Sequence, residues 1–229
     1  MEICKYGNTQ CLEHPSGIFI FPYFQIVPFK LLHVDPSTLP LELEVIYLIA
    51  YSCLTGSIIT LIYNKRISKD WKKFKNNSTS FFSQSLKPYL SAIFVMIFSN
   101  LIIQLFIHNG LAGNEQSIRD SFNSTPFYIF FSAVLYAPVV EELTFRLSIK
   151  KIFSNKWLFI IISGLLFGSL HVLTSFNDIT DLFFIIPYSA PGIAFAYILE
   201  KTDNILVPIS FHLIHNGIMI SLLTLISFV

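Results

Sequence analysis

The sequence predicts an all-α protein, a polytopic transmembrane bundle of six to seven spanning helices. Three observations support this prediction. Hydrophobic residues make up 53% of the 229 residues and charged residues only 13%, and the mean hydropathy of +0.63 is far above that of soluble domains. Apolar stretches of membrane-spanning length recur along the chain. The balance of 15 basic and 14 acidic residues also excludes an ordinary basic nucleic-acid-binding protein.

Six apolar stretches are long enough to cross a bilayer as helices, which requires about 20 residues. They cover residues 45–63, 88–107, 127–149, 157–173, 182–199 and 205–228. A further apolar stretch, residues 17–34, is interrupted by Pro22, Pro28 and Lys30, and both a re-entrant segment and a seventh span remain open there. The sequence thus predicts an N-terminal segment, residues 1–44, and a transmembrane helical domain, residues 45–229.

The basic residues lie mainly on one side of the predicted membrane. Residues 64–87 between the first two spans contain seven of them, and twelve of the fifteen in the chain fall on that side when the spans alternate. Because cytoplasmic loops are enriched in Lys and Arg, we expect residues 64–87 to form a cytoplasmic loop. The polar start of the chain indicates no cleavable signal peptide. The chain is rich in Phe, Ile, Asn and Lys, as proteins of AT-rich genomes tend to be, which favours a bacterial protein. Its expected location is therefore the bacterial cytoplasmic membrane.

The three cysteines do not indicate a disulfide framework or a metal cluster. Cys4, Cys11 and Cys53 are too few and too widely spaced for either. A bridge between Cys4 and Cys11 remains open, although two free thiols are favoured. The chemistry of the chain therefore depends on other residues.

Polar side chains of the later spans are predicted to meet in one layer of the membrane. Ionisable residues at such depth are costly, so they indicate function by default. With a rise of about 1.5 Å per residue, they lie roughly 13 to 22 Å from the basic ends of their helices. The layer contains Glu141 in the third span, His171 in the fourth, and His212 and Asn216 in the sixth, and Glu142 and Arg146 follow Glu141 in its span.

The two adjacent glutamates are expected to have different tasks. Residues four apart share a helix face, whereas neighbours point about 100° apart. Glu142 can therefore pair with Arg146, which leaves Glu141 facing elsewhere and able to act on water. A packing network without chemistry is the alternative for these three residues, and the two histidines at matching depth weigh against it. His215 points away from His212 and is interpreted as a packing residue or as a residue that supports the site from behind.

Three motifs on successive apolar helices resemble those of one protease family. Glu141-Glu142-Leu-Thr-Phe-Arg146 fits EExxxR, Phe167-Gly-Ser-Leu-His171 fits FxxxH, and His212-Leu-Ile-His-Asn216 fits HxxxN. The chain resembles the CPBP intramembrane proteases, which include type II CAAX prenyl endopeptidases and bacterial abortive-infection and bacteriocin-immunity relatives. The protease-like core covers about residues 127–223.

The resemblance implies an intramembrane endopeptidase that hydrolyses a peptide bond near the cytoplasmic leaflet. It implies that Glu141 deprotonates a water held by His171, and that His212 and Asn216 donate to the oxyanion of the scissile carbonyl. Glu142, Arg146 and Phe167 would support the site. The expected partners are a membrane-associated peptide or protein substrate and the lipid bilayer, and no nucleic acid.

Metal dependence and substrate identity remain open at this level. Glu141, His171 and His212 are candidate zinc ligands of the two-histidine, one-carboxylate kind, but the HExxH arrangement is absent. A zinc site and metal-free activation of water are about equally supported. A prenylated substrate would follow from the endopeptidase resemblance, yet bacterial relatives act on other substrates.

Two non-proteolytic alternatives differ in what they predict for the polar layer. A membrane scaffold or sensor that retains the protease fold would use the layer for packing or for ligand sensing. A transporter would spread its polar residues across the bilayer, whereas here they cluster at one depth.

Overall fold

The computed structural model describes residues 40–107 and 110–227, and every regular element in these ranges is helical. The expected segment 17–34 and nearly all of the N-terminal segment 1–44 lie outside the described residues. In chain order the elements are α3 (Leu41–Ile62), α4 (Asn64–Phe106), α5 (Gly113–Ser124), α6 (Pro126–Ile129), η4 (Phe130–Tyr136), α7 (Ala137–Glu141), η5 (Glu142–Arg146), α8 (Leu147–Ile152), α9 (Lys156–Leu173), η6 (Ile179–Phe184), α10 (Ile185–Thr202) and α11 (Leu206–Ser227).

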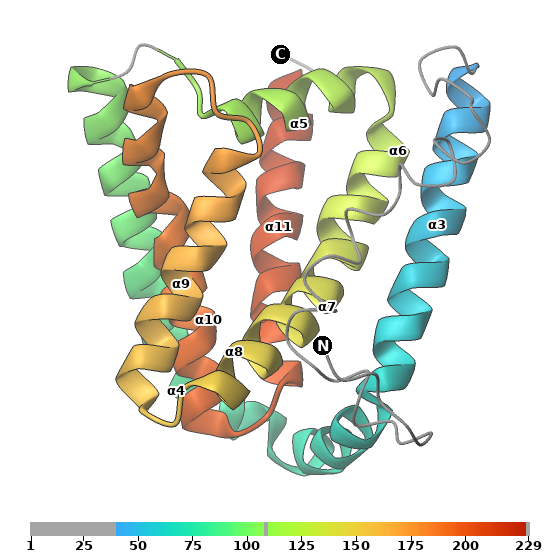
Figure 1. The fold of residues 1–229 in the computed structure, drawn as a ribbon, viewed down its shortest axis with the longest axis vertical. Coiled ribbons are helices and arrows are strands. Elements are labelled where there is room, and N and C mark those ends of the chain that lie inside the picture. Colours follow the sequence, from blue (N-terminus) through green and yellow to red (C-terminus); the bar gives the residue numbers. More distant parts are fainter. Residues whose placement is uncertain (1–39, 108–109, 228–229) are drawn as a thin grey trace, which may run out of the picture.

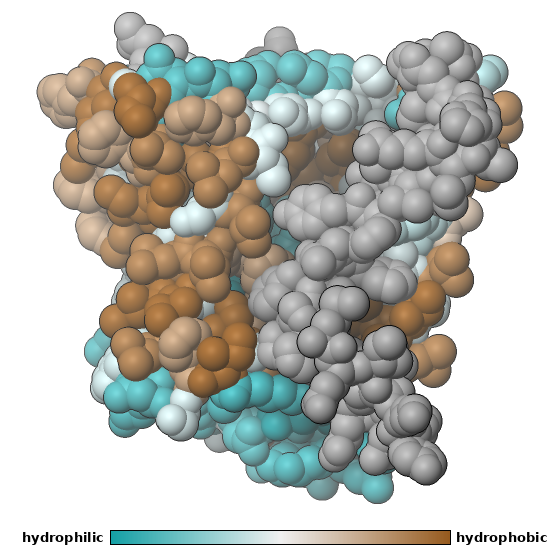
Figure 2. Space-filling view, viewed as in Figure 1, coloured by the Kyte–Doolittle hydropathy of each residue, from teal (hydrophilic) through white to brown (hydrophobic). Residues whose placement is uncertain are grey.

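The polytopic helical bundle is confirmed. Six helical segments of the described chain are long and apolar enough to cross a membrane: Leu41–Ile62, Asn64–Phe106, Pro126–Ile152, Lys156–Leu173, Ile179–Thr202 and Leu206–Leu225. In Figure 2 the molecule shows a broad apolar band between two hydrophilic ends, as expected for a chain whose middle contacts lipid. The chain is therefore a multi-pass membrane protein.

Figure 1 shows how the spans are arranged around the centre of the molecule. α11 stands in the middle, with α4, α9 and α10 on one side and the composite span from α6 to α8 on the other. α10 packs against α9, α4 and α11, and α11 contacts η4 and α7. The short helix α5 lies across the end of the bundle opposite the start of α4. The polar residues of three spans thus face a common interior.

Two glycines bring α9 and α10 unusually close together. A Cβ atom on Gly164 would lie 2.7 Å from the backbone nitrogen of Ile193, and one on Gly168 would lie 2.7 Å from that of Ser189. Small residues four apart on a membrane helix allow this approach of two backbones. The close packing places Phe167 and His171 of α9 beside α10.

Residues 64–87 are not the expected loop but the first part of the α4 helix, and their cytoplasmic location stays a prediction. The segment crosses the end of the bundle before the helix turns into its membrane-spanning part (Figure 1). Pro88 lies inside α4 and has no N–H, so the carbonyl of Gln84 lacks its helical donor. Lys201 Nζ, 3.1 Å away, donates to that oxygen and ties α4 to α10.

A buried carboxylate fastens the first part of α4 to the turn between α10 and α11. Asp70 is fully buried, and its Oδ2 accepts from Arg66 Nε at 2.7 Å and from the backbone N–H of Ile205 at 2.8 Å. Arg66 also donates to Oδ1 of Asp203 at 2.9 Å. Asp203 has φ 43°, a left-handed conformation that Asp tolerates better than most residues. The first part of α4 is therefore held against the turn between α10 and α11 by ionic contacts and hydrogen bonds.

Candidate active site

The span that carries the two glutamates is not a regular α-helix. Seven residues, Phe130–Tyr136, and five residues, Glu142–Arg146, form π-helical turns, with the short α7 between them. Such turns contain one residue more than an α-turn and occur frequently at functional sites. Glu141 is the last residue of α7 and Glu142 the first of η5.

Glu142 and Arg146 form a closed ion pair in the protein interior. Both side chains are fully buried, with Arg146 Nε 2.9 Å from Glu142 Oε2 and Nη2 3.3 Å from Oε1. Arg146 Nη1 donates to Ser163 Oγ at 2.8 Å, and the guanidinium lies 4.9 Å from the ring centre of Phe167. These contacts satisfy a charge pair that would otherwise be costly to bury.

His212 connects the two glutamates from α11. Its Nδ1 lies 3.1 Å from Glu142 Oε1, and its Nε2 lies 4.0 Å from Glu141 Oε2. Glu142 is ionised by its pairing with Arg146 and can only accept, so Nδ1 of His212 carries the hydrogen. The ring stacks on Phe195, with centres 4.9 Å apart. Its orientation is thereby fixed, with Nε2 directed toward Glu141.

His171 is held on α9 by a similar arrangement. Its Nδ1 lies 2.9 Å from the carbonyl oxygen of Phe167, which can only accept, so Nδ1 again carries the hydrogen. The ring packs against Phe167 and stacks on Tyr188, with centres 4.4 and 5.4 Å away. Nε2 of the neutral ring is then an acceptor that can hold a water molecule.

Asn216 occupies a different position from the one expected for an oxyanion donor alone. Its Nδ2 donates to the carbonyl oxygen of Ala133 in η4 at 2.7 Å. One of its two amide hydrogens is therefore engaged within the protein, and the second is available for another acceptor.

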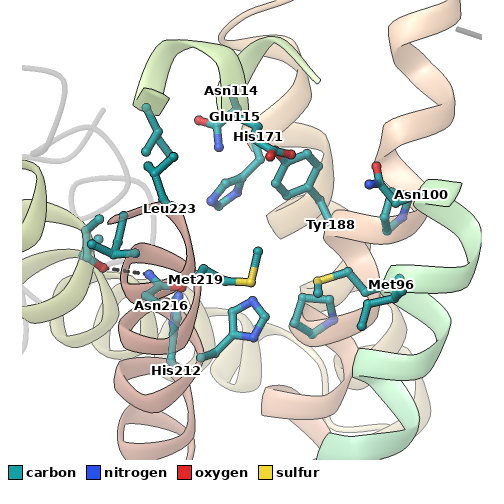
Figure 3. A pocket seen from close by; sticks show the side chains of 18 of the residues that line it. Met96, Asn100, Asn114, Glu115, His171, Tyr188, His212, Asn216, Met219 and Leu223 are labelled. Atoms are coloured by element: carbon teal, nitrogen blue, oxygen red, sulfur yellow. Dashed lines mark hydrogen bonds between the residues drawn. The ribbon is translucent and has the colours of Figure 1, made fainter. Parts of the chain in front are cut away.

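These side chains line one cavity of about 630 Å³. Figure 3 shows His171, Tyr188, His212 and Asn216 around it, with Asn114 and Glu115 of α5 at its far end. We expected the site to open toward the cytoplasmic leaflet. The cavity extends from Glu141 to α5, whereas Leu143, Phe159 and Arg146 are fully buried and do not line it, and the leaflet that it faces stays a prediction.

The three candidate zinc ligands, Glu141, His171 and His212, do not form a metal-binding group in this arrangement. No three His, Cys, Asp or Glu side chains of residues 40–107 and 110–227 lie close enough together to hold a metal ion. His171 and His212 do have the tautomer in which Nε2 could ligate, but Glu141 does not join both of them.

Several contacts in the site had no clear signal in the sequence. Tyr188 and Ser163 belong to no motif, yet they contact His171 and Arg146. His215, expected to pack or to support the site from behind, lines the same cavity, and its Nδ1 lies 3.4 Å from the hydroxyl of Tyr89. His14, His33 and His108 lie outside the described residues. Spacing alone could have indicated Ser163, since it is four residues before Phe167.

Comparison with known proteins places the three motifs in a single family. Residues 123–218 match the family model described as type II CAAX prenyl endopeptidase Rce1-like. The chain is 26% identical over 172 residues to the putative membrane peptidase YdiL of Bacillus subtilis, covering 71% of this chain and 66% of that relative. The aligned part is thus just under two thirds of that relative.

Two other relatives are similar over different extents. The membrane-embedded CAAX protease MroQ of Staphylococcus aureus is 24% identical over 217 residues, which cover 89% of this chain and 85% of MroQ. An uncharacterized protein of Mycoplasma capricolum is 30% identical over 142 residues, 58% of this chain and 41% of that protein. No solved structure matches the chain. Residues 123–218 thus match the Rce1-like family model, and the chain as a whole is similar to relatives named as a membrane peptidase and a membrane-embedded CAAX protease.

Proposed function

We propose that this protein is an intramembrane endopeptidase in which Glu141 activates water. The observation that carries the proposal is the state of Glu141 Oε2, a buried carboxylate oxygen with no hydrogen-bond partner among the described residues. Leaving such an atom unpaired costs free energy. The neighbouring Glu142 is paired with Arg146 and His212, so of the two adjacent glutamates the one whose oxygen makes no hydrogen bond is also the one that lines the cavity.

The proposed reaction is general-base hydrolysis of a peptide bond. Glu141 takes a proton from a water held by Nε2 of His171, and the resulting hydroxide attacks the scissile carbonyl carbon. The carbonyl oxygen becomes an oxyanion, which the second amide hydrogen of Asn216 and an Nε2–H of His212 stabilise. Glu141 then gives the proton to the peptide nitrogen, the oxyanion collapses to a carbonyl as the C–N bond breaks, and the carboxyl and amine products leave.

Glu141 as a base and His212 as a hydrogen-bond donor to the oxyanion require a particular protonation state of each side chain. Because Nδ1 of His212 already donates to Glu142, the ring can donate from Nε2 only as the imidazolium. The active form is thus an ion pair between ionised Glu141 and protonated His212, whose facing atoms lie 4.0 Å apart. The charge of Arg146 is balanced by Glu142 and does not disturb this pair.

We further propose that the substrate is a peptide segment of a membrane-associated protein that enters from the end covered by α5. Most of the positively charged residues belong to the segments at the other end, which by the positive-inside rule supports an orientation with α5 outside the cytoplasm. The bacterial relatives favour a bacterial cytoplasmic membrane. MroQ is named a CAAX protease, and a substrate with a lipidated cysteine is the corresponding alternative.

The geometry favours an enzyme over a scaffold that retains the fold. A scaffold would gain stability from pairing Glu141, and it would have no use for a cavity of about 630 Å³ beside it. The test is incubation of the purified protein with internally quenched peptides that contain apolar segments, with the cleavage sites mapped by mass spectrometry. Cleavage by the wild type that disappears in Glu141→Gln supports the proposal, and equal cleavage by both proteins contradicts it.

A further inference from the structure

The carbonyl oxygen of Ala133 has lost both of the donors that its own helix could supply. In an α-helix it would accept from the N–H of Ala137, but that N–H donates to Ser132 five residues earlier. In the π-turn it would accept from residue 138, which is proline and has no N–H. The oxygen therefore needs a donor from outside the span.

Asn216 supplies this donor from α11. Its Nδ2 lies 2.7 Å from the Ala133 oxygen, and Figure 3 shows the amide turned toward that carbonyl. The turn is also held from its other side, because the hydroxyl of Tyr136 lies 2.8 Å from Thr55 Oγ1 of α3. Two neighbouring spans thus hold η4 by polar contacts.

The π-turn determines which residue of the span faces the cavity. Ala133, Ala137 and Glu141 all line it, and the extra residue of the turn lies before Glu141. Without that extra residue, the helix beyond it would be rotated by about 100°. Another residue would then take the place of Glu141 in the cavity.

We infer that Asn216 is a positioning residue, which sets the orientation of Glu141 by satisfying the carbonyl oxygen that Pro138 leaves without a donor. This inference rests on the proposed function, in which Glu141 is the base. The role is additional to the oxyanion contact, because it uses only one of the two amide hydrogens. It makes a specific prediction about the pair Asn216 and Pro138.

A double-mutant cycle tests the inference. Asn216→Ala removes the donor, and Pro138→Ala creates a backbone N–H at the position where the π-turn directs it toward Ala133. We expect Asn216→Ala to lower kcat by about a hundredfold in the wild-type background. In the Pro138→Ala background the same substitution should lower kcat by about tenfold or less. The matched control is Pro88→Ala in α4, a proline inside a helix that is not among the residues lining the cavity, and in that background Asn216→Ala should have its full effect.

An effect on kcat that is the same in the Pro138→Ala and wild-type backgrounds would overturn the inference and leave Asn216 as an oxyanion donor only. The unfolding temperatures of the same four proteins in detergent give a second readout that needs no activity. Coupling in unfolding temperature without any proteolysis supports the positioning role and contradicts the proposed function. Where Asn216→Ala does not fold, Asn216→Leu, which fills the space without a donor, replaces it in the same cycle.

Discussion

His212 donates the hydrogen on Nδ1 to Oε1 of Glu142, 3.1 Å away, and this bond joins α11 to the π-turn η5 inside the bundle. Glu142 also accepts from Arg146, so one carboxylate fixes both a cation and an imidazole. The other ring nitrogen of His212 is left to face Glu141. Adjacent glutamates consequently have separate tasks, one in holding the site and one in its chemistry.

Glu141→Gln should separate activity from stability. The substitution removes the proposed base, and we expect proteolysis to fall by a factor of about 100 to 10,000. It also removes a buried, unpartnered carboxylate oxygen, so the unfolding temperature in detergent should be unchanged or higher. Activity and thermal unfolding are measured on the same preparation.

Glu200→Gln is the control for Glu141→Gln. Glu200 pairs with Lys150 at 3.0 Å near the basic end, away from the cavity, and both partners are partly exposed. This variant should retain wild-type activity, with a change in stability below about 1 kcal/mol. Residual cleavage in Glu141→Gln at the wild-type rate would remove Glu141 from the mechanism.

The ion pair of Glu142 and Arg146 should affect stability because each buried charge neutralises the other. It should affect activity because Glu142 also holds His212. Arg146→Leu leaves a fully buried carboxylate without its cation and should lower the free energy of unfolding by about 3 to 5 kcal/mol. The double variant Glu142→Leu, Arg146→Leu should recover most of that stability. It should stay inactive, because His212 loses the acceptor that fixes its Nδ1–H.

Denaturant or thermal unfolding in detergent, with the proteolysis assay beside it, checks this prediction. Lys150→Leu is a control that breaks a partly exposed ion pair with Glu200 and should cost less than about 1 kcal/mol. An active double variant would show that the bond from Glu142 to His212 has no part in catalysis.

The spans and the polar layer could be predicted because they depend on simple rules. A membrane helix needs a long apolar stretch, and the rise of a helix fixes the depth of Glu141, His171 and His212. The pairing of Glu142 with Arg146 likewise follows from spacing by four residues. No tertiary information is needed for these inferences.

Other features depend on packing that the pattern does not contain. The first part of α4 combines lysines with Phe74, Phe81 and Phe82 and has no long apolar run, so its pattern predicts a loop and not a helix. The π-turns escape a search that assumes 3.6 residues per turn. The direction of the cavity depends on how α5 and α4 cover its outer end, which the depth of Glu141 does not reveal.

The contact between Arg66 and Asp203 should make stability depend on pH. Burial opposes ionisation of Asp203, but the hydrogen bond from Arg66 and the charges of Arg66 and Lys73 outweigh it and lower the pKa of Asp203 from 3.8. A carboxyl with a lowered pKa in the folded state stabilises the fold above its unfolded pKa. This contribution is lost as the pH falls below 3.8 through the folded value.

Asp203→Asn should therefore lower the unfolding temperature at pH 7, and the difference from wild type should shrink in strongly acidic solution. Asn tolerates the left-handed backbone at this position, so the variant tests charge and not strain. The effect should be below about 1 kcal/mol because the side chain is half exposed. In an Arg66→Gln background it should be smaller, and an unchanged effect there would exclude this ion pair as its cause.

The orientation in the membrane decides which side supplies the substrate. Asn76 is an exposed position in the first part of α4, and Gln116 is exposed on α5 at the other end. After Cys4, Cys11 and Cys53 are replaced by serine, Asn76→Cys should be protected from a membrane-impermeant thiol reagent added to intact cells, whereas Gln116→Cys should be labelled. The reason is that the basic end of the bundle is expected to be cytoplasmic.

Labelling after permeabilisation is the control, because both cysteines should then react equally if both are accessible. The reverse pattern in intact cells would place α5 and the outer end of the cavity in the cytoplasm. A lipidated cytosolic tail could then reach Glu141 through the end covered by α5. With the expected pattern, such a tail meets the filled basic end of the bundle, and the peptide segments cleaved by the protein must come from the extracytoplasmic side.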